Sequence, residues 1–353
     1  MWPERSVIGW DVGGAHLKAC LLVSGRVRDV AQWPCALWQG LEQLDAALGW
    51  ARARWPNMAR AAHAVTMTGE MADVFEHRAQ GVQRIAERMA LQPGIALALY
   101  AGERGWCAAD AAGDHWADIA SANWLATARL VARRVGDGVL VDIGSTTTDL
   151  IALRRERVAA CGRTDAARLA SGELVYQGVV RTPLCALTRQ LGFRGQRCNV
   201  MNEFFASTAD VYRLTGELDA THDLHPAADG GAKDADGTRR RLARMIGMDA
   251  ADASEHEWLD AARTWRGHQT AEIGEQLERV ANQAAVASQA PLISAGCGSF
   301  LVQELAANAG RPCLSFACDV APLEPGAAAH VARWAQVCAP SVAVAALFDE
   351  ERR

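Results

Sequence analysis

The chain contains two stretches with the same order of apolar and polar positions, residues 8–27 and 139–158. In each, an apolar run leads to an aspartate, a turn of small or polar residues follows, and a second apolar run comes next. Aligned without a gap, Asp11 falls on Asp142 and Gly13 falls on Gly144. This pattern predicts strand, tight turn and strand in both copies. Because the copies lie far apart, we expect a two-lobed α/β protein with one copy in each lobe.

The rest of the chain shows apolar residues at helical spacing or in short runs typical of buried strands. Helices are predicted over 38–55, 79–91, 123–134, 199–215, 239–248, 255–288, 300–309 and 326–348, and further strands over 26–33, 62–67, 95–100, 292–294 and 312–317. Residues 219–238 are rich in His, Asp, Gly and Ala and are predicted to form a mobile loop. His222 and His225 lie there without a matched ligand set, so we expect them to be solvated rather than metal-bound.

The chain length of 353 residues also predicts two lobes. A single hydrophobic core stops growing at roughly 250–300 residues. Gly136, Asp137 and Gly138 mark the expected boundary. We therefore expect an N-terminal lobe over residues 1–135 and a C-terminal lobe over 136–353, the latter with a helical insertion over 196–288.

Composition and charge exclude some classes of binding partner and predict the cellular compartment. The net charge is −5, and the sequence has no block of basic residues that could bind a nucleic-acid backbone. Nucleic acid is therefore not an expected partner. No apolar run is long enough to cross a membrane and no signal peptide is visible, so we expect a cytoplasmic protein without a membrane partner. The ten cysteines contain no Cys-x-x-Cys pair and are expected to be buried thiols.

The turn of the second copy carries candidate phosphate chemistry. It offers successive backbone N–H groups, which form an anion-binding concavity, and four hydroxyls, those of Ser145, Thr146, Thr147 and Thr148. An aspartate stands at each end, Asp142 and Asp149. This suits a shared Mg²⁺, because Mg²⁺ binds through one or two carboxylates and substrate phosphates. The alternative is an ordinary hairpin with a Ser/Thr-rich turn.

The first copy and a third glycine turn differ in their chemistry. In the first copy Lys18 stands opposite Asp149, and Gly14 and His16 stand opposite Ser145 and Thr147. The third turn holds Gly296 and Gly298 between a predicted strand and a predicted helix. Glycines there let the backbone approach a ligand, although such turns are also common packing devices.

Together these turns resemble the superfamily that contains sugar kinases, Hsp70 and actin, and more narrowly its hydantoinase/oxoprolinase branch. The first phosphate motif matches residues 11–18, the second matches 142–149, and the adenosine motif corresponds to Gly296 and Gly298. The resemblance implies two ribonuclease H-like lobes around a central cleft. It also implies phosphate contacts from Gly13, Gly14, His16, Lys18, Gly144, Ser145, Thr146, Thr147, Thr148, Gly296 and Gly298, and metal contacts from Asp11, Asp142 and Asp149.

Four further motifs, at residues 67–73, 121–124, 172–183 and 202–205, resemble proteins linked to the tetrahydromethanopterin C1-transfer pathway, whose archaeal relatives include the methanofuran-biosynthesis synthase. This implies a transferase that condenses an aminomethylfuran-methyl diphosphate with the phenol of glutamyltyramine. Diphosphate leaves, and Mg²⁺ or a similar divalent cation assists. The partners would then be a small-molecule diphosphate and a phenolic amine, and the sequence leaves a homodimer open.

The same resemblance suggests roles for further residues. Asp11 and Asp142 are expected to be catalytic, and Glu70, Asp73 and Glu173 are candidates for the carboxylate that takes the phenol proton. Expected substrate contacts are stacking by Trp124 and Tyr176 and clamping of an anion by Arg163 and Arg181. The alternatives are core packing for the aromatic rings and structural salt bridges for the arginines.

Two other readings of the motifs stay open. The first keeps the fold and takes ATP as its ligand, as a small-molecule kinase or an ATP-dependent hydrolase of the oxoprolinase type. The second is a nucleotide-gated chaperone or cytoskeletal protein. Fold alone does not decide between them, because this fold hosts many functions.

Overall fold

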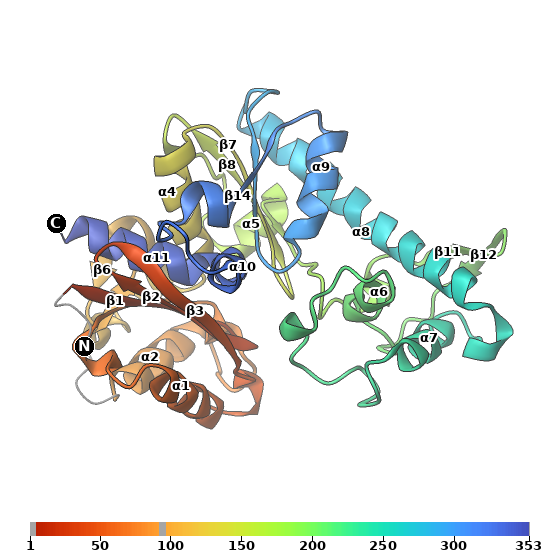
Figure 1. The fold of residues 1–353 in the computed structure, drawn as a ribbon, viewed down its shortest axis with the longest axis horizontal. Helices are drawn as coiled ribbons and strands as arrows, with labels where there is room; N and C mark the ends of the chain where they lie inside the picture. The colour runs from red at the N-terminus through yellow and green to blue at the C-terminus, as the bar shows by residue number, and fades with distance from the viewer. Residues whose placement is uncertain (1–4, 92–96, 353) are drawn as a thin grey trace. The chain divides into compact units, whose positions relative to one another are not determined.

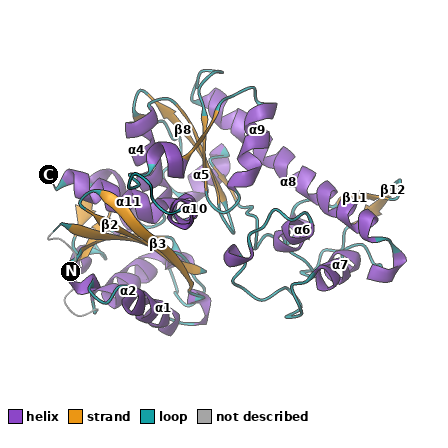
Figure 2. Ribbon diagram, in the orientation of Figure 1, coloured by secondary structure: helices purple, strands orange, loops and turns teal. Residues whose placement is uncertain are grey.

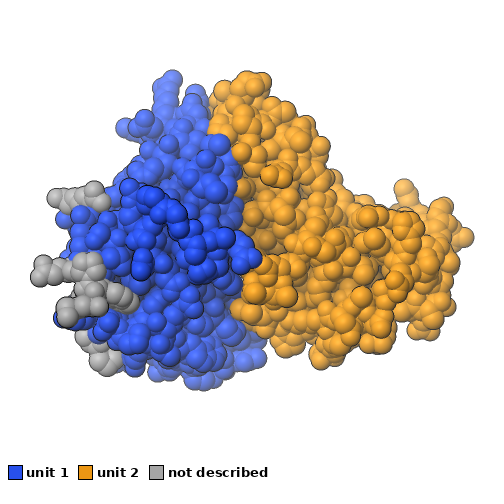
Figure 3. Space-filling model, viewed as in Figure 1, with its two compact units in different colours: residues 1–137, 153–158, 314–353 blue, residues 138–152, 159–313 orange. Residues whose placement is uncertain are grey.

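The computed structural model describes residues 5–91 and 97–352. The chain divides into two compact units, coloured blue and orange in Figure 3. The first unit comprises residues 1–137, 153–158 and 314–353, and the second comprises 138–152 and 159–313. Each unit is built on its own β-sheet (Figures 1 and 2).

The first unit holds a six-stranded sheet in the order β3-β2-β1-β4-β5-β6. Its strands are β1 (Ser6–Val12), β2 (His16–Val23), β3 (Arg26–Pro34), β4 (Ala62–Met67), β5 (Leu97–Tyr100) and β6 (Trp106–Cys107). β1, β2 and β3 form an antiparallel meander, and β4 joins β1 in parallel. The parallel pairing places the carboxyl ends of β1 and β4 together, so the segments that follow them meet at one edge of the sheet.

Helices α1 (Glu42–Arg54) and α2 (Arg78–Ala90) pack on one face of this sheet and α11 (Ala339–Glu351) packs on the other. The unit also contains α3 (Trp116–Ile119), α4 (Asn123–Val135) and α10 (Ala329–Val337). Ile8, Trp10 and Val12 point into the core shared with α1 and α2. Gly9 points to the opposite face, because side chains alternate along a strand. A Cβ built on Gly9 would lie 2.1 Å from the carbonyl oxygen of Ser341, so α11 packs directly on the strand backbone.

The second unit contains the other copy of the strand–turn–strand pattern. The sheet order is β10-β8-β7-β13-β14, and β9 pairs with β8. The strands of this sheet are β7 (Gly138–Ile143), β8 (Thr148–Arg154), β9 (Arg157–Val158), β10 (Leu174–Val175), β13 (Leu292–Ala295) and β14 (Cys313–Ser315). Of these, β9 and residues 314–315 of β14 group with the first unit. β13 runs parallel to β7, which again brings two strand ends to the same edge.

The rest of the second unit is mostly helical, as predicted for the insertion. It contains α5 (Asp165–Ser171), α6 (Thr208–Leu214), α7 (Ala235–Arg244), α8 (Glu255–Gln283), α9 (Val302–Asn308) and a hairpin of β11 (Gln190–Phe193) and β12 (Gln196–Asn199). A continuous core joins the strands to α6, α7, α8 and α9. The segment 219–238, predicted to be a loop up to its end, becomes α7 at Ala235, where the Asp234 side chain caps the helix.

Two predicted helices differ from the structure, and one predicted strand is described only in part. The helix predicted over 199–215 begins only at Thr208, because Ser207 and Asp210 form a capping box there. The helix predicted over 326–348 is two helices, α10 and α11, which meet at Cys338 with Pro340 in the first turn of α11. The predicted strand 95–100 is described from Leu97 onward, and residues 95 and 96 lie outside the described part.

The C-terminal forty residues do not follow the predicted boundary between lobes. Residues 314–353 group with the first unit rather than with residues 138–313. The reason is the packing of α11 on β1, β2 and β4. A single boundary between residues 135 and 136 cannot describe this grouping, because α11 packs on the sheet of the first unit.

The described residues contain no single helix that is both long and apolar enough to cross a membrane. α10 and α11 would meet that criterion only as a pair, and they are bent by 94°. The ten cysteines are all free thiols, but only Cys20, Cys35 and Cys338 are buried. The prediction of buried thiols is therefore wrong for the others, of which Cys161, Cys313 and Cys318 are exposed.

Candidate anion-binding and active site

Both copies of the predicted turn close with the same hydrogen bond. The Gly13 amide donates to the His16 carbonyl at 3.0 Å, and the Gly144 amide donates to the Thr147 carbonyl at 2.8 Å. These are the residue pairs that the gapless alignment of the two stretches superposes. The structure thus confirms the internal repeat at the level of individual atoms.

The second turn has backbone amides that are available to bind a ligand. Within the described chain, the amides of Ser145, Thr146 and Thr147 donate no hydrogen bond, and these residues are partly exposed. The Ser145 and Thr146 hydroxyls lie 3.4 Å apart. Successive free amides with adjacent hydroxyls form a cradle for an anion.

A segment behind the second turn holds it in place. The amides of Val179, Val180 and Arg181 donate to the Gly144 and Ser145 carbonyls at 2.9–3.1 Å. A Cβ on Gly178 would lie 2.4 Å from both Ser145 C and Thr146 N. The turn therefore rests directly on the Gly178 backbone, and only glycine permits this approach.

Side chains also form hydrogen bonds with the backbone amide and carbonyl of Gly178. Its amide donates to the Thr182 hydroxyl at 2.8 Å, and its carbonyl accepts from the Thr208 hydroxyl at 2.8 Å and the Gln269 amide nitrogen at 3.0 Å. Gln269 also accepts a hydrogen bond of 2.7 Å from the Tyr212 hydroxyl. Helices α6 and α8 are thus connected to the back of the anion turn.

Other residues predicted to bind phosphate have structural roles. The Thr148 hydroxyl donates to the Gln177 carbonyl at 2.7 Å and is buried. The Gly298 amide donates to the Ile143 carbonyl at 2.8 Å. Gly296 has φ +83°, and a Cβ there would lie 2.5 Å from Asp142 Oδ1. The third glycine turn therefore packs against the end of β7, and the Thr148 and Gly298 donors are not available to a ligand.

One of the predicted metal ligands in the second unit, Asp149, is already engaged in an ion pair. Asp149 forms an ion pair with the buried Arg168, which also lies 3.6 Å from Asp165. A metal would have to compete with that guanidinium, so the prediction of Asp149 as a ligand does not fit. Asp142 and Asp11 stay at their strand ends. The described residues contain no cluster of three or more His, Cys, Asp or Glu suited to a metal.

Glu173 is a structural carboxylate rather than a base. It is 1% exposed and accepts hydrogen bonds from the amides of Cys161 at 2.6 Å and Gly162 at 2.8 Å. The Ser171 hydroxyl donates to it at 2.7 Å. Both carboxylate oxygens are engaged in holding the loop before α5, so the predicted proton-accepting role does not fit this geometry.

The first turn lies between two short helices. The Gly14 and Ala15 amides donate no hydrogen bond to the described residues, while the Gly14 carbonyl accepts from the Leu37 amide at 3.0 Å in η1 (Leu37–Gln39). On the other side η3 (Gly69–Met71) follows β4, and a Cβ on Gly69 would lie 3.2 Å from the Val12 carbonyl oxygen. Asp11 stands opposite Lys18 on β2 and Thr66 on β4.

Glu70 is the buried carboxylate next to this turn. It is 1% exposed, and its Oε1 accepts from the Ser121 hydroxyl at 2.7 Å and from Arg78 Nη2 at 3.3 Å. Asp73, by contrast, is exposed. Trp124 is 3% exposed in the core, so its predicted stacking on a substrate ring is wrong.

Arg181 and Tyr176 lie beside the second turn, whereas Arg163 is exposed on the loop before α5. Burial lowers the pKa of Arg181, and the nearby Tyr176 hydroxyl acts in the opposite direction. A half-buried guanidinium gains stability from a bound anion. Tyr176 is 63% exposed, which leaves its ring face open for stacking.

Several site residues have no individual signal in the sequence. Arg78, Arg168 and Gln269 are polar residues within helical patterns, and their partners lie far along the chain or in other elements. Ser121 and Gly178 lie in motifs that carry the family resemblance, so their presence is visible although their contacts are not.

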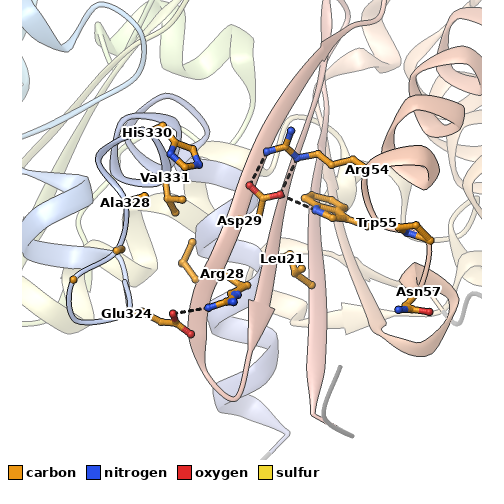
Figure 4. Close-up of a pocket in the computed structure, with 14 residues that line it drawn as sticks. Leu21, Arg28, Asp29, Arg54, Trp55, Asn57, Glu324, Ala328, His330 and Val331 are labelled. Atoms are coloured by element: carbon orange, nitrogen blue, oxygen red, sulfur yellow. Dashed lines mark hydrogen bonds and ion pairs between the residues drawn. The ribbon is translucent and has the colours of Figure 1, made fainter. Parts of the chain in front are cut away.

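A separate pocket of about 600 Å³ lies in the first unit beside β3 (Figure 4). Its charged groups neutralise one another: Arg54 binds Asp29 at 2.8 Å and Arg28 binds Glu324 at 3.0 Å. None of the predicted site residues lines it. This pocket is therefore not a candidate for the predicted site, whereas the anion turn of each unit remains one.

The family model for hydantoinase/oxoprolinase matches residues 61–318. The chain belongs to the hydantoinase/oxoprolinase family. Two relatives are named (4-{4-[2-(gamma-L-glutamylamino)ethyl]phenoxymethyl}furan-2-yl)methanamine synthase. The one from Methanocaldococcus jannaschii is 29% identical over 257 residues, which is 72% of this chain and 76% of the relative. The one from Methanococcus vannielii is 33% identical over 124 residues, 35% of this chain and 55% of the relative.

A solved structure of nucleotide-free acetone carboxylase matches 97% of this chain and 70% of its own, with a TM-score of 0.57 and 10% identity. At that identity the likeness concerns the fold. The predicted fold class, that of the sugar kinase, Hsp70 and actin superfamily, is confirmed, and the family supports an enzyme.

Proposed function

We propose that the protein joins a phenol oxygen to the methylene carbon of a furan, with diphosphate as the leaving group. The observation that carries this proposal is the 29% identity over 257 residues to a synthase whose named product contains a phenoxymethyl link to a furan. The substrates would be an (aminomethylfuranyl)methyl diphosphate and glutamyltyramine or a close analogue. The product would serve a methanofuran-type cofactor of tetrahydromethanopterin-linked C1 metabolism.

The free amides of the turns support the leaving-group half of this reaction. When the C–O bond breaks, its electron pair stays on the diphosphate, where negative charge grows. The amides of Ser145, Thr146 and Thr147 are placed to stabilise that charge without reorganisation. The Gly14 and Ala15 amides offer an equivalent cradle in the first unit.

Mg²⁺ fits this site as a partner of the substrate rather than as a resident of a protein cage. In each unit a single strand-end aspartate, Asp11 in the first and Asp142 in the second, would contact a Mg²⁺ bound with its diphosphate, while Asp149 pairs with Arg168. This limited donor set suits Mg²⁺, which usually keeps several waters and binds one or two carboxylates plus phosphate oxygens. When bound, the ion would neutralise charge on the departing diphosphate.

Glu70 is the carboxylate that fits the proton transfer best. The phenol oxygen forms the new bond to the cationic furfuryl carbon, and its proton must then leave. An oxygen that bears both an aryl and an alkyl group in addition to this proton is strongly acidic, so a carboxylate such as that of Glu70 suffices as acceptor. Asp73 is exposed and Glu173 is engaged in its loop. Tyr176 and Arg181 would contact the ring and anionic groups of the substrates.

The test begins with thermal unfolding in Mg²⁺, comparing pyrophosphate with ATP and ADP. A ligand that binds the folded state raises the melting temperature. We expect stabilisation by pyrophosphate, followed by release of diphosphate and formation of an ether of the expected mass from the two substrates. Stabilisation by ATP alone, with no ether formed, would replace the proposal by an ATP-dependent kinase or hydrolase.

A further inference from the structure

The carboxylate of Glu70 is held by groups from two other segments of the first unit. Ser121, two residues before the start of α4, donates its hydroxyl proton to Oε1 at 2.7 Å. Arg78, the first residue of α2, reaches the same oxygen at 3.3 Å and the Ser121 hydroxyl at 3.2 Å. The three side chains therefore form a closed triangle of contacts.

The backbone around Glu70 is equally constrained. Gly81 lies one turn after Arg78 on α2, and a Cβ there would lie 2.4 Å from the Glu70 carbonyl oxygen and 2.7 Å from its Cα. The first turn of α2 thus packs on η3 itself, which contacts Val12 and Gly13 of the anion turn through Gly69. Displacement of Glu70 is blocked on both sides.

Ser121 adopts a left-handed backbone conformation, with φ +51°. A serine in this region is strained, and such strain persists where the surroundings require one side-chain position. Glycine would remove the strain but would also remove the hydroxyl that contacts Glu70. Ser121 thus combines a strained backbone with a hydroxyl that contacts Glu70.

We propose that Ser121 is a positioning residue: together with Arg78 it holds the Glu70 carboxylate in one orientation beside the first anion turn. This inference rests on the proposed function for the role of Glu70, and it adds a residue that acts through Glu70 without touching substrate. Arg78 supplies the compensating charge, since an isolated buried carboxylate is costly. Ser121 sets the direction of the carboxylate.

The test compares S121G with S121A, because the first keeps the left-handed backbone without strain and both lack the hydroxyl. We expect each to lower kcat about tenfold, the usual effect of losing one hydrogen bond to a charged group, with KM and the pyrophosphate-induced melting shift unchanged. E70Q should lower kcat by about 100-fold or more. The E70Q/S121G double variant should be no slower than E70Q, because residues that act as a unit are not additive.

The matched control is S171A. Ser171 donates to Glu173 at the same distance, 2.7 Å, but that carboxylate holds a loop of the second unit. We expect S171A to lower the melting temperature without lowering kcat. Full activity of S121G, or losses in S121G and E70Q that multiply in the double variant, would overturn the positioning role.

A separate readout distinguishes this proposal from the proposed function. If the wild-type protein forms no ether, the proposed function fails, and urea unfolding of the same four variants still tests the contact. The urea midpoint should fall less in E70Q/S121G than the sum of the two single shifts. Additive shifts would show that Ser121 does not hold Glu70.

Discussion

Gly178 shows how one backbone position supports the site. Its peptide is held by Thr182, Thr208 and Gln269, and the Ser145–Thr146 peptide rests on its Cα. No side chain fits there without moving the turn. The turn can therefore pack against position 178 only because glycine has no Cβ.

We predict that G178A abolishes the stabilisation by pyrophosphate, because the added Cβ would displace the Thr146 amide from the cradle. Overpacking of this kind also destabilises by about 1–3 kcal/mol. Melting curves with and without pyrophosphate measure both effects. G192A is the control, since a Cβ at Gly192 meets nothing within 4 Å. An undiminished pyrophosphate shift in G178A would contradict the support from Gly178.

His63 is a second residue whose surroundings decide its chemistry. Its ring stacks on Trp10, accepts a hydrogen bond of 2.9 Å from the Trp10 indole and pairs with the Met58 carbonyl at 3.0 Å. Burial lowers its pKa from 6.5 to about 4. The folded protein therefore holds a neutral ring where the unfolded chain would bind a proton.

This shift predicts a loss of stability in mild acid. The contribution of His63 is complete above pH 6.5 and declines as the pH falls toward 4, because protons then bind preferentially to the unfolded chain. The full effect is on the order of 3 kcal/mol. Urea unfolding between pH 7.5 and 4.5 measures it, and H63Q should flatten the dependence. An unchanged slope in H63Q would assign the pH effect to other groups.

At the scale of elements, helix α11 decides whether the first sheet is covered. Most of its residues are buried, from Ala339 to Phe348, which is unusual for a terminal segment. It packs on the face of β1 opposite the α1–α2 core, and Gly9 makes the contact possible. The strand and helix lie more than 300 residues apart in the chain.

The pair G9A and G49A tests this packing. A Cβ at Gly9 would lie 2.7 Å from Ala345 Cβ, so G9A should destabilise by about 1–3 kcal/mol. Gly49 lies exposed within α1 with nothing near its Cβ position, so G49A should stabilise by about 0.5–1 kcal/mol. Urea midpoints report both. Equal midpoints for G9A and wild type would contradict close packing of α11.

At the scale of the whole molecule, the chain begins and ends in the same unit. Residues 314–353 group with residues 1–137, and the second unit is formed by the chain between them. The first unit is therefore complete only after the last helix has been made. Such a connection makes its folding depend on contacts of high sequence separation.

We predict that deletion of residues 326–353 prevents the first unit from folding, because it exposes the sheet face that α11 covers. Circular dichroism and the cooperativity of thermal unfolding are the measurements. Deletion of residues 352–353 alone is the control and should leave unfolding unchanged. A cooperative transition of wild-type size in the longer deletion would show that α11 is dispensable.

The sequence by itself determined the features that depend on neighbours along the chain. The two strand–turn–strand copies, most helices and the positions of the anion turns follow from local periodicity and from turn residues such as Gly13 and Gly144. Local hydrogen bonds and alternating burial leave their pattern in adjacent residues, so these features can be read directly.

Only the tertiary structure decided what each polar side chain does. Glu70, Asp149 and Glu173 are equivalent carboxylates in the sequence, yet one lies with Ser121 and Arg78, one pairs with Arg168, and one accepts loop amides. Their partners are set by packing between distant segments. The physical reason is that the ionisation and availability of a buried carboxylate depend on groups within a few ångströms in space, which spacing along the chain does not specify.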